Sequence, residues 1–352
     1  MERCLILARQ GEGMVAPNPL VGCVIIQGRE IIGEGYHSAF GFPHAEAEAI
    51  ASVADPSHLK GATLIVNLEP CAHFGKTPPC ADIIIKSGIG KVVLGAQDPN
   101  SLVAGKGILK LKSAGIEVIE GMLEKESKEL NKEFFCYHTK KRPYIILKWA
   151  QTQDTFISLP PPFTKENNHI TSSFSDTLSH LWRSRKQSIW IGTNTALLDQ
   201  PRLTVRKISG KNPIRIVIDR NNSIPRHHPL FSKEAETWIY HSKDCSFSPP
   251  QSDIKVIPID FSSSVPRQIL NHLYQSQIIT VLVEGGAFLL KSLIDADLWD
   301  EARIYTGAHS FQSGLESPVL KNAILKQSLK LGKDTLQVFI RDTALPRESL
   351  PE

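Results

Sequence analysis

Short runs of β-branched and other apolar residues alternate with helical patterns between residues 20 and 120. Two such runs, VGCVII and EIIGEG, flank Gln27–Gly28 and predict a β-hairpin. Farther along, TLIVNLEP, KVVLGA and IEVI predict strands, whereas HAEAEAIASV and CADIIIKSG predict helices, the second one closed by Gly88. This alternation is typical of helices packed on a mostly parallel sheet, so we expect an α/β layer structure.

The pattern changes near residues 138 to 144. Before this point, LEKESKELNKEFFCYHTKKRP predicts one longer helix that Pro143 ends. Its apolar positions recur at helical spacing: Leu123, Leu130, Phe134 and Tyr137. A second series of strand-like runs follows, PYIILKWA, SIWIGT, PIRIVID, TWIYH, ITVLVEGG and DEARIYTG, with Pro- and Ser-rich loops expected at SLPPPFTKENN and SFSPPQSD. We therefore expect two domains of different fold, residues 1–142 and residues 143–352.

Length and composition agree with two ordinary globular domains. The chain has 352 residues, and a single hydrophobic core stops growing at about 250 to 300 residues. Hydrophobic residues at 41% and charged residues at 22% argue against disorder and coiled coil. The net charge of +4 is small and Lys140–Arg142 is the longest basic run, so nucleic acid is not expected as a partner. No apolar run reaches the roughly 20 residues that span a bilayer, and we expect a cytoplasmic protein.

Two of the six cysteines, Cys71 and Cys80, bracket a loop in the stretch EPCAHFGKTPPC. A disulfide, a structural metal clip and a catalytic metal site can each account for such a pair. In a reducing compartment scattered cysteines stay thiols unless a metal binds them. The other four cysteines are expected to be packing or surface residues: Cys4, Cys23, Cys136 and Cys245.

A His-x-Glu at His44–Glu46 opens a predicted helix upstream of this pair. Together with the later Pro-Cys and second Cys it has the H-x-E…P-C…C form of the zinc deaminases. His44, Cys71 and Cys80 would be three zinc ligands that leave the fourth tetrahedral position open, as a catalytic zinc requires. Glu46 would be the general acid/base that moves protons from the attacking water to the ring and the leaving ammonia. Because residues two apart do not share a helix face, His44 is expected at the helix cap.

Other interpretations of these residues stay open. His44 could be a hydrogen-bonded core histidine with inert cysteines nearby, or the zinc site could be structural and closed by His73. Eight residues separate the cysteines, instead of the two found in most zinc deaminases, and they include His73, Lys76 and Thr77. This cationic loop indicates a small phosphorylated substrate.

Six segments of the first half recur together in one known family: APNPLVGCVI, GEGYH, HAEAEAI, NLEPCAHFGKTPPC, DPNSLVAGKGI and LNKEFF. Over nearly all of residues 3 to 140 the chain resembles the bifunctional riboflavin biosynthesis deaminase/reductases, and the long cysteine spacing with GKTPPC is specific to them. The resemblance implies a cytidine-deaminase-like three-layer α/β/α domain with zinc (Zn2+). Its substrate would be 2,5-diamino-6-(5-phosphoribosylamino)pyrimidin-4(3H)-one. Asn18 would contact the pyrimidine, and the phosphoribosyl side would be lined by His73, Lys76, Asp98 and Asn100. From the residues alone, Asp98–Asn100 could equally be an Asx turn.

In the second half, TVLVEGGAFLLKSLI predicts a strand, a Gly-Gly turn and a helix whose free backbone N–H groups could bind an anion. Arg183 and Arg206 flank an earlier strand and would suit a phosphate-bearing ligand, although a tight turn and surface charges can also explain these features. PYIILKWAQTQD, ITS, IWIGTNTALLDQPRLTVR, PIRIVID and VEGG resemble the reductase domain of the same family. That resemblance implies a dihydrofolate-reductase-like α/β fold and reduction, with NADPH, of the ribosyl group of 5-amino-6-(5-phosphoribosylamino)uracil to ribityl.

The resemblance to the reductase also implies two sets of contacts. The residues that would touch NADPH are Ala150, His169, Thr195, Asp199, Gly286 and Ala287. The residues that would hold the substrate are Lys148, Asp154, Arg183, Leu203, Arg206 and Glu284. The chain departs from the family's usual K-x-A-x-S-x-D-G at Thr155, with Phe156 in place of a basic residue next, and His169 replaces a common tryptophan. Threonine resists the positive φ that glycine adopts freely.

The sequence therefore predicts a bifunctional enzyme, with a zinc deaminase in residues 1–142 and an NADPH-dependent reductase in residues 143–352. Three alternatives stay open: a deaminase joined to a degenerate reductase domain, a deaminase of nucleic-acid bases, and a non-enzymatic zinc-containing binding module. The family resemblance and the apolar strands lead us to expect a homo-oligomer.

Overall fold

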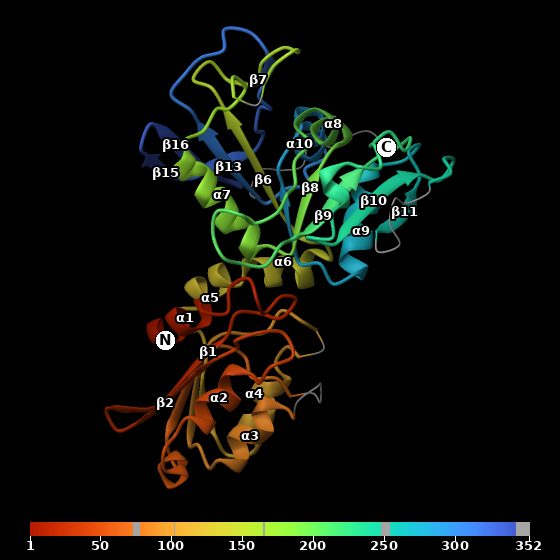
Figure 1. The fold of residues 1–352 in the computed structure, drawn as a ribbon. Helices are drawn as coiled ribbons and strands as arrows, with labels where there is room; N and C mark the ends of the chain where they lie inside the picture. The colour runs from red at the N-terminus through yellow and green to blue at the C-terminus, as the bar shows by residue number, and fades with distance from the viewer. Residues whose placement is uncertain (73–77, 102, 165, 248–253, 343–352) are drawn as a thin grey trace. The chain divides into compact units, whose positions relative to one another are not determined.

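A computed structural model of the chain describes residues 1–72, 78–101, 103–164, 166–247 and 254–342 (Figure 1). Its contacts divide the chain into two compact units, Met1–Arg142 and Pro143–Glu352. Among the described residues, no helix has both the length and the apolar character that crossing a membrane requires.

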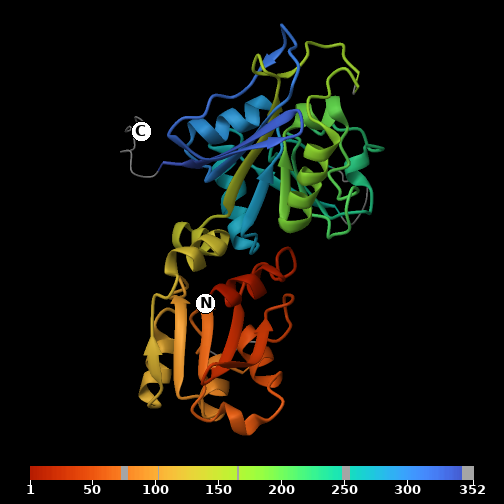
Figure 2. The same cartoon turned by 90° about the vertical axis from the view of Figure 1, so that its left-hand side faces the viewer.

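The first unit is built on a sheet with the strand order β2-β1-β3-β4-β5, coloured red to orange in Figure 2. The strands are β1 (Gly22–Gln27), β2 (Glu30–Tyr36), β3 (Thr63–Leu68), β4 (Lys91–Ala96) and β5 (Glu117–Ile119). The hairpin predicted around Gln27–Gly28 is confirmed, since Gln27 lies opposite Glu30. β1 runs antiparallel to both neighbours, whereas β3, β4 and β5 are parallel. The prediction of a mostly parallel sheet holds for strand direction, since β2, β3, β4 and β5 run the same way and only β1 is reversed.

Helices cover both faces of this sheet. They are α1 (Glu2–Arg9), α2 (Ala45–Ala51), α3 (Cys80–Lys86), α4 (Lys106–Ser113) and the short 3-10 helix η1 (Pro56–Leu59). Apolar residues of α2, α3 and α4 form one core with residues of β1, β3 and β4. On the opposite face, Cys4 and Leu7 of α1 pack against Val24 of β1. These are the three layers, α/β/α, that the sequence predicts.

The single long helix predicted before residue 143 is in fact two, α5 (Glu124–Leu130) and α6 (Lys132–Lys140). Asn131 separates them, with φ −103° and ψ 20°. Its buried amide makes two hydrogen bonds with the backbone of Leu20: Oδ1 accepts from the N–H and Nδ2 donates to the carbonyl. Because this bond pair fixes Asn131 to a segment 111 residues away, the helix breaks at a point that apolar spacing does not reveal.

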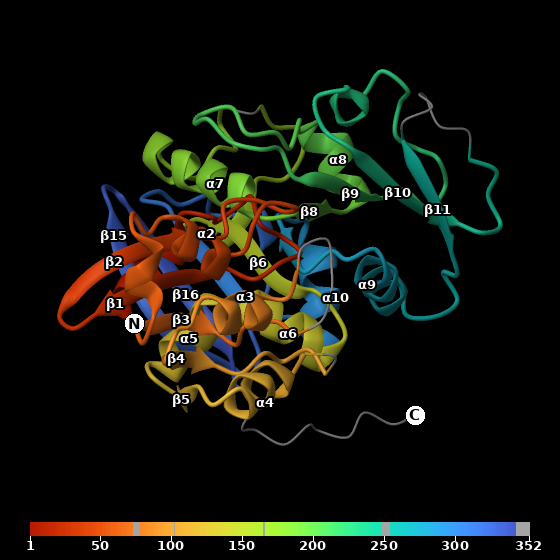
Figure 3. The same ribbon diagram turned by 90° about the horizontal axis from the view of Figure 1, so that it is seen from below.

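The second unit is built on a nine-stranded sheet within the described residues, in the order β11-β10-β9-β8-β12-β6-β13-β16-β15 (Figure 3). Neighbours from β11 to β13 run parallel, and β16 is antiparallel to both β13 and β15. The strands are β6 (Tyr144–Gln151), β8 (Ser188–Ile191), β9 (Ile214–Ile218), β10 (Thr237–Ser242), β11 (Lys255–Ile259), β12 (Thr280–Val283), β13 (Glu301–Thr306), β15 (Ala323–Leu331) and β16 (Asp334–Arg341). A separate pair joins β7 (Phe156–Ser158) to β14 (Leu315–Glu316).

Helices also lie on both faces of this second sheet. They are α7 (Ser173–Arg185), α8 (Thr193–Asp199), α9 (Val265–Gln275), α10 (Ala287–Asp295) and the 3-10 helix η2 (Pro229–Phe231). α9 and α10 share a core with Trp190 of β8, whereas α8 and η2 share another with Ile191 of the same strand. Because β8 and β12 are parallel neighbours, α8 and α10, which follow them, begin at the same edge of the sheet. That edge is where a ligand of an open α/β sheet is expected to bind.

Candidate functional site

His44 is the N-cap residue of α2, with extended dihedrals of φ −75° and ψ 159°. This confirms the prediction that His44 lies at the cap, outside the helix. Its Nδ1 lies 3.2 Å from Sγ of Cys80, the first residue of α3, and 3.7 Å from Sγ of Cys71, which follows β3. The three candidate ligand atoms all lie within 4.8 Å of one another.

The donor set and its distances fit a zinc ion. Zn–S bonds of about 2.3 Å and Zn–N bonds of about 2.0 Å at the tetrahedral angle separate nitrogen from sulfur by roughly 3.5 Å. The two N–S distances of His44 lie on either side of this value. The hydrogen bond with Cys80, against the raising effect of burial, and then the one with His44 lower the pKa of Cys71, which favours the thiolate form that a metal binds. His73, the fourth ligand of the alternative structural site, lies outside the described residues.

Glu46 lies in the first turn of α2, two residues after His44, and its side chain is only 3% exposed. Burial, reinforced by the neighbouring Cys71 sulfur, raises the pKa of Glu46 to about 7. A carboxyl group whose pKa lies near neutrality can both accept and donate a proton. The sequence assigned this role to Glu46, and its position beside the metal-binding cluster suits it.

Asn18 is held by a residue to which the sequence analysis gave no role, His37. Nδ1 of His37 lies 3.0 Å from the carbonyl oxygen of Pro43, which can only accept, so Nδ1 carries the ring proton. Nε2 then accepts a hydrogen bond from Nδ2 of Asn18 at 3.0 Å. The contact turns the amide nitrogen of Asn18 toward His37 and directs Oδ1 elsewhere. The ring of His37 lies edge-on to His44 at 5.5 Å, which places Asn18 near the metal-binding cluster.

Asp98 and Asn100 follow β4 and form the Asx turn that the sequence left as an alternative. The N–H of Asn100 donates to Oδ1 of Asp98 at 2.7 Å. Burial raises the pKa of Asp98 to about 6. The N–H of Asp98 donates to Glu69, two residues before Cys71, so this turn is attached to the segment of a metal ligand. Lys76, like His73, lies outside the described residues.

In the second unit, Arg183 of α7 and Glu284 after β12 form a bidentate ion pair. Nε and Nη2 of Arg183 lie 2.9 and 2.6 Å from the two carboxylate oxygens, and the side chains are 13% and 6% exposed. Against the raising effect of burial, Arg183 and Lys148 hold the pKa of Glu284 at about 2. Burial lowers the pKa of Lys148, whose ammonium lies 5.6 Å from the ring centre of Tyr305. Three of the predicted substrate residues therefore form one charged cluster.

Thr195 of α8 and the turn before α10 come together at the edge where both helices begin. Oγ1 of Thr195 accepts a hydrogen bond from the N–H of Gly286 at 2.8 Å. A Cβ added at Gly286 would lie 3.0 Å from that oxygen, so a side chain here would crowd the turn. Ala287 is the first residue of α10, and Asp199 is the exposed last residue of α8. Four of the predicted cofactor residues thus belong to one pair of helices.

The segment after α8 carries two of the three remaining predicted substrate residues, Leu203 and Arg206. The N–H of Arg206 donates to Nδ1 of His180 at 3.0 Å, and its Nη1 donates to Thr204. Burial, with Arg183 and Arg206 nearby, lowers the pKa of His180 to about 4, which keeps the ring neutral. The side chain of Leu203 is 2% exposed and packs in the hydrophobic core that contains Ala196 of α8 and Ile191 of β8. Leu203 therefore offers a ligand only its backbone.

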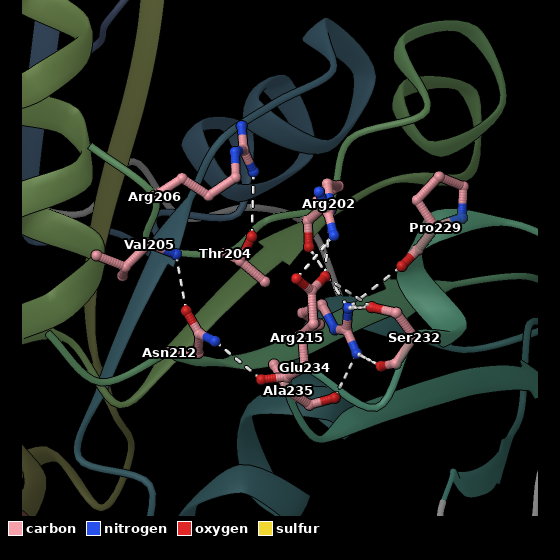
Figure 4. A network of polar contacts seen from close by, with 10 residues as sticks. All are labelled: Arg202, Thr204, Val205, Arg206, Asn212, Arg215, Pro229, Ser232, Glu234 and Ala235. Atoms are coloured by element: carbon pink, nitrogen blue, oxygen red, sulfur yellow. Dashed lines mark hydrogen bonds and ion pairs between the residues drawn. The ribbon is translucent and has the colours of Figure 1, made fainter. Parts of the chain in front are cut away.

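Figure 4 shows what anchors this segment. The buried guanidinium of Arg215 donates to the backbone carbonyls of Arg202, Pro229, Ser232 and Ala235. Oδ1 of Asn212 accepts from the N–H of Val205, and its Nδ2 donates to the carbonyl of Glu234. These bonds hold the backbone of residues 202–206 in place (Figure 4). The side chain of Arg206 is exposed on the surface of the second unit.

Three predicted reductase residues contact residues other than Lys148, Arg183 and Glu284. The carboxylate of Asp154 accepts hydrogen bonds from the backbone N–H groups of Phe311 and Gln312, at 3.2 and 2.7 Å. His169 is half exposed, and its Nε2 lies 3.5 Å from Asp176. Ala150 of β6 pairs with Tyr305 of β13. The carboxylate of Asp154 and Nε2 of His169 therefore each have a partner within the second unit.

Thr155 adopts φ 66°, the left-handed conformation that glycine favours. Its backbone is fixed on both sides, because its N–H donates to Thr152 and its carbonyl accepts from Ser317. The sequence identified this position as one where glycine is usual. The structure shows that threonine takes the glycine conformation rather than changing the turn.

We expect Thr155→Gly to stabilise the second unit by about 0.5–1 kcal/mol, because the strain of a β-branched residue at positive φ exceeds the extra entropy that glycine loses. All five tryptophans lie after residue 143, so the urea midpoint of tryptophan fluorescence reports on this unit. Thr155→Ala keeps a Cβ and should gain less. A midpoint that is unchanged or lower in Thr155→Gly would contradict strain at this residue.

Comparisons with known proteins agree in both halves. Residues 1–96 match the family model of the cytidine and deoxycytidylate deaminase zinc-binding region, and residues 143–335 match the RibD C-terminal domain. Riboflavin biosynthesis protein RibD of Aquifex aeolicus is 38% identical over 347 residues, which are 98% of this chain and 96% of that protein. The Escherichia coli protein of the same name is 36% identical and covers 87% of this chain and 86% of its own.

A solved structure covers the whole fold. The diaminohydroxyphosphoribosylaminopyrimidine deaminase/5-amino-6-(5-phosphoribosylamino)uracil reductase of Thermotoga maritima superposes with a TM-score of 0.87 at 36% identity and covers 97% of both chains. Acinetobacter baumannii RibD in its second form gives a TM-score of 0.86 at 30% identity, over 96% of this chain and 97% of its own. The cytidine-deaminase fold followed by a dihydrofolate-reductase-like fold, which the sequence predicts, is confirmed.

Proposed function

Since the chain belongs to the RibD family of bifunctional deaminase/reductases of riboflavin biosynthesis, we propose that its two units carry out the two reactions in succession. The first unit removes the exocyclic amine of 2,5-diamino-6-(5-phosphoribosylamino)pyrimidin-4(3H)-one as ammonia. The second reduces the ribosyl group of 5-amino-6-(5-phosphoribosylamino)uracil to ribityl with NADPH. The observation that carries the proposal is the cluster of His44, Cys71 and Cys80 beside the buried carboxyl group of Glu46.

In the deaminase, His44, Cys71 and Cys80 would hold zinc, which when bound activates a water as the nucleophile. Glu46 accepts one proton of the attacking water and delivers it to the ring nitrogen next to the attacked carbon. It then takes the proton of the newly formed hydroxyl and passes it to the amine, which departs as ammonia. Burial raises the pKa of Glu46, so the carboxyl group holds a proton readily between these transfers. Burial of Glu46 also keeps bulk water from competing for the proton.

Substrate recognition in the deaminase divides between two sets of residues. Asn18, whose Nδ2 is occupied by His37, presents Oδ1 to an N–H of the pyrimidine. We assign the phosphoribosyl side to Asp98 and Asn100 and, by family resemblance, to His73 and Lys76, which lie outside the described residues. The Asx turn supports the assignment of Asp98 and Asn100, because it orders their segment before the ligand arrives.

In the reductase, NADPH binds where α8 and α10 begin. The residues at that edge suit a dinucleotide phosphate: a side chain at Gly286 would crowd Oγ1 of Thr195, and the amino-terminal end of the nine-residue helix α10 can bind an anion. Thr195 and Ala287 lie near this edge, whereas Asp199 is at the carboxyl end of α8. Asp199, Ala150 and His169 complete the proposed cofactor contacts. NADPH, when bound, supplies the hydride, and the protein contributes alignment.

The substrate of the reductase lies against the charged cluster. Lys148, Arg183 and Glu284 orient the ribosyl group by hydrogen bonds from and to its hydroxyls, with Asp154 and the backbone of Leu203 as further contacts. Arg206 binds the phosphate, which its exposed guanidinium and anchored backbone support. Assembly as a homo-oligomer stays a prediction from the sequence.

Arg206→Ala tests the phosphate contact. A charge-assisted hydrogen bond is worth about 1.5–3 kcal/mol, so we expect the KM of the reductase for its phosphorylated substrate to rise about 10- to 100-fold. Arg202→Ala is the matched control, because Arg202 lies on the same segment but pairs with Glu234 at the surface. The KM for the substrate without its phosphate should not change in either variant. Equal KM values for Arg206→Ala and the parent chain would refute the contact.

A further inference from the structure

We propose that Glu69 is a positioning residue of the deaminase. Its carboxylate joins the segment that carries the metal ligand Cys71 to the loop that carries Asp98 and Asn100, and so it fixes the substrate-binding loop relative to the metal. The inference rests on the proposed contacts of Asp98 and Asn100 with substrate. Glu69 itself has no part in the proton transfers or the metal site described above.

Four backbone N–H groups donate to this one side chain, which is 4% exposed. Oε2 of Glu69 accepts from Asp98 at 3.2 Å and from Gly105 at 3.0 Å. Oε1 accepts from Gly107 at 3.0 Å and from Ile108 at 3.3 Å. The donors lie at both ends of the connection between β4 and α4: Asp98 is two residues after β4, and Gly107 and Ile108 are in the first turn of α4.

The bonds also complete the amino-terminal end of α4. The N-cap residue of this helix is Gly105, with φ 76° and no side chain that could accept a hydrogen bond. The N–H groups of the second and third helical residues, Gly107 and Ile108, would therefore lack a partner in their own segment. Glu69 supplies both acceptors from the end of β3, and its charge suits the positive end of the helix.

Close packing makes the connection rigid. A Cβ added at Gly107 would lie 1.9 Å from the carbonyl oxygen of Pro70 and 3.2 Å from Oε1 of Glu69. The first turn of α4 therefore lies against the backbone between Glu69 and Cys71. The N–H of Glu69 also donates to Ala96, the last residue of β4. A displacement of Glu69 would therefore move the segment of Cys71 and the loop of Asp98 and Asn100 together.

The chemistry of the site requires a carboxylate. All four partners are N–H donors, so the side chain between them must present two accepting oxygens. Glutamine has the same shape but only one oxygen, and its NH2 group would face two donors. Glu69→Gln therefore removes about half of the connection without changing the volume of the side chain.

The test compares Glu69→Gln with Glu117→Gln, a surface variant at the end of the same sheet whose partner is Lys91. We expect the KM of the deaminase for the diaminopyrimidine to rise about 10- to 100-fold in Glu69→Gln, with a smaller change in kcat. Zinc content per chain should stay the same, and amide hydrogen exchange should become faster at Gly105, Gly107 and Ile108. Glu69→Asp keeps both oxygens on a shorter side chain, so its KM should lie between those of Glu69→Gln and the parent chain. This variant remains informative if Glu69→Gln folds poorly. Unchanged KM and exchange in both variants would overturn the proposal.

A double-mutant cycle with Asn100→Ala separates positioning from general stabilisation. If Glu69 acts through the loop, its replacement should raise KM much less once the Asn100 side chain is gone. Where Asn100→Ala alone raises KM, additive effects of the two changes on KM would overturn the proposal. If Asn100→Ala alone leaves KM unchanged, the assigned substrate contact of Asn100 fails. In that case a raised KM with faster exchange in Glu69→Gln still supports positioning by Glu69, and an unchanged KM rejects it.

Discussion

Glu46→Gln is expected to stop ammonia release while the chain keeps its zinc. The amide fills the same buried space next to His44, so the fold and the three ligands should be preserved. It cannot accept the proton of the attacking water or donate one to the leaving amine. General acid/base groups contribute about 10²- to 10⁴-fold, and we expect kcat to fall by about 10³-fold or more because Glu46 acts in both steps. Ammonia release and zinc content measured on the same sample check the prediction.

Glu48→Gln is the matched control. Glu48 lies in the same first turn of α2 but is exposed, so its replacement should leave deamination within about twofold of the parent chain. Zinc content serves as the internal control for folding of the first unit in each variant. Deamination at the parent rate in Glu46→Gln would rule out the assigned mechanism.

Glu284→Gln is expected to destabilise the second unit by about 3–5 kcal/mol. The change leaves the guanidinium of Arg183, which is 13% exposed, without the carboxylate that both of its donors contact. Removing one partner of a buried ion pair has this cost because the other charge remains away from water. The urea midpoint of tryptophan fluorescence measures the loss, and reduction should be lost with it while deamination continues.

Two further variants test the cause of this loss. Glu234→Gln breaks the exposed pair with Arg202 and should cost at most about 1 kcal/mol. Arg183→Met combined with Glu284→Gln removes both charges and should recover most of the stability. The pKa of Glu284 is lowered from 4.5 to about 2, so the contribution of the pair is complete above pH 4.5 and disappears as the pH falls toward 2. A loss below 1 kcal/mol in Glu284→Gln at neutral pH would refute this account.

Residues that act through local sequence could be predicted. Only a residue at a cap can place its side chain on the same side as one two positions later, and the structure has His44 at the cap. The H-x-E…P-C…C pattern likewise identified the metal site, in which Cys71 follows a strand and Cys80 begins a helix. Thr155 is another local case, because it stands where the family usually has glycine and adopts the left-handed conformation that glycine favours, at φ 66°.

Features that depend on distant partners could not be predicted. The break at Asn131 depends on hydrogen bonds to Leu20, and the antiparallel position of β1 depends on which strands pair. Glu69 gave no signal in the sequence, because its partners are backbone N–H groups 29 to 39 residues away. Leu203 was assigned by resemblance alone, and neither pattern nor spacing shows that its side chain belongs to the core.

The central claim is that both units of this chain are active on successive compounds. The most direct test supplies purified, zinc-loaded protein with the diaminopyrimidine phosphoriboside and NADPH and follows ammonia release and NADPH absorbance together. The account predicts that one NADPH is oxidised for each ammonia released, after a lag in which the deaminated intermediate accumulates. Ammonia release with no loss of NADPH would contradict it and would leave a deaminase joined to an inactive reductase domain.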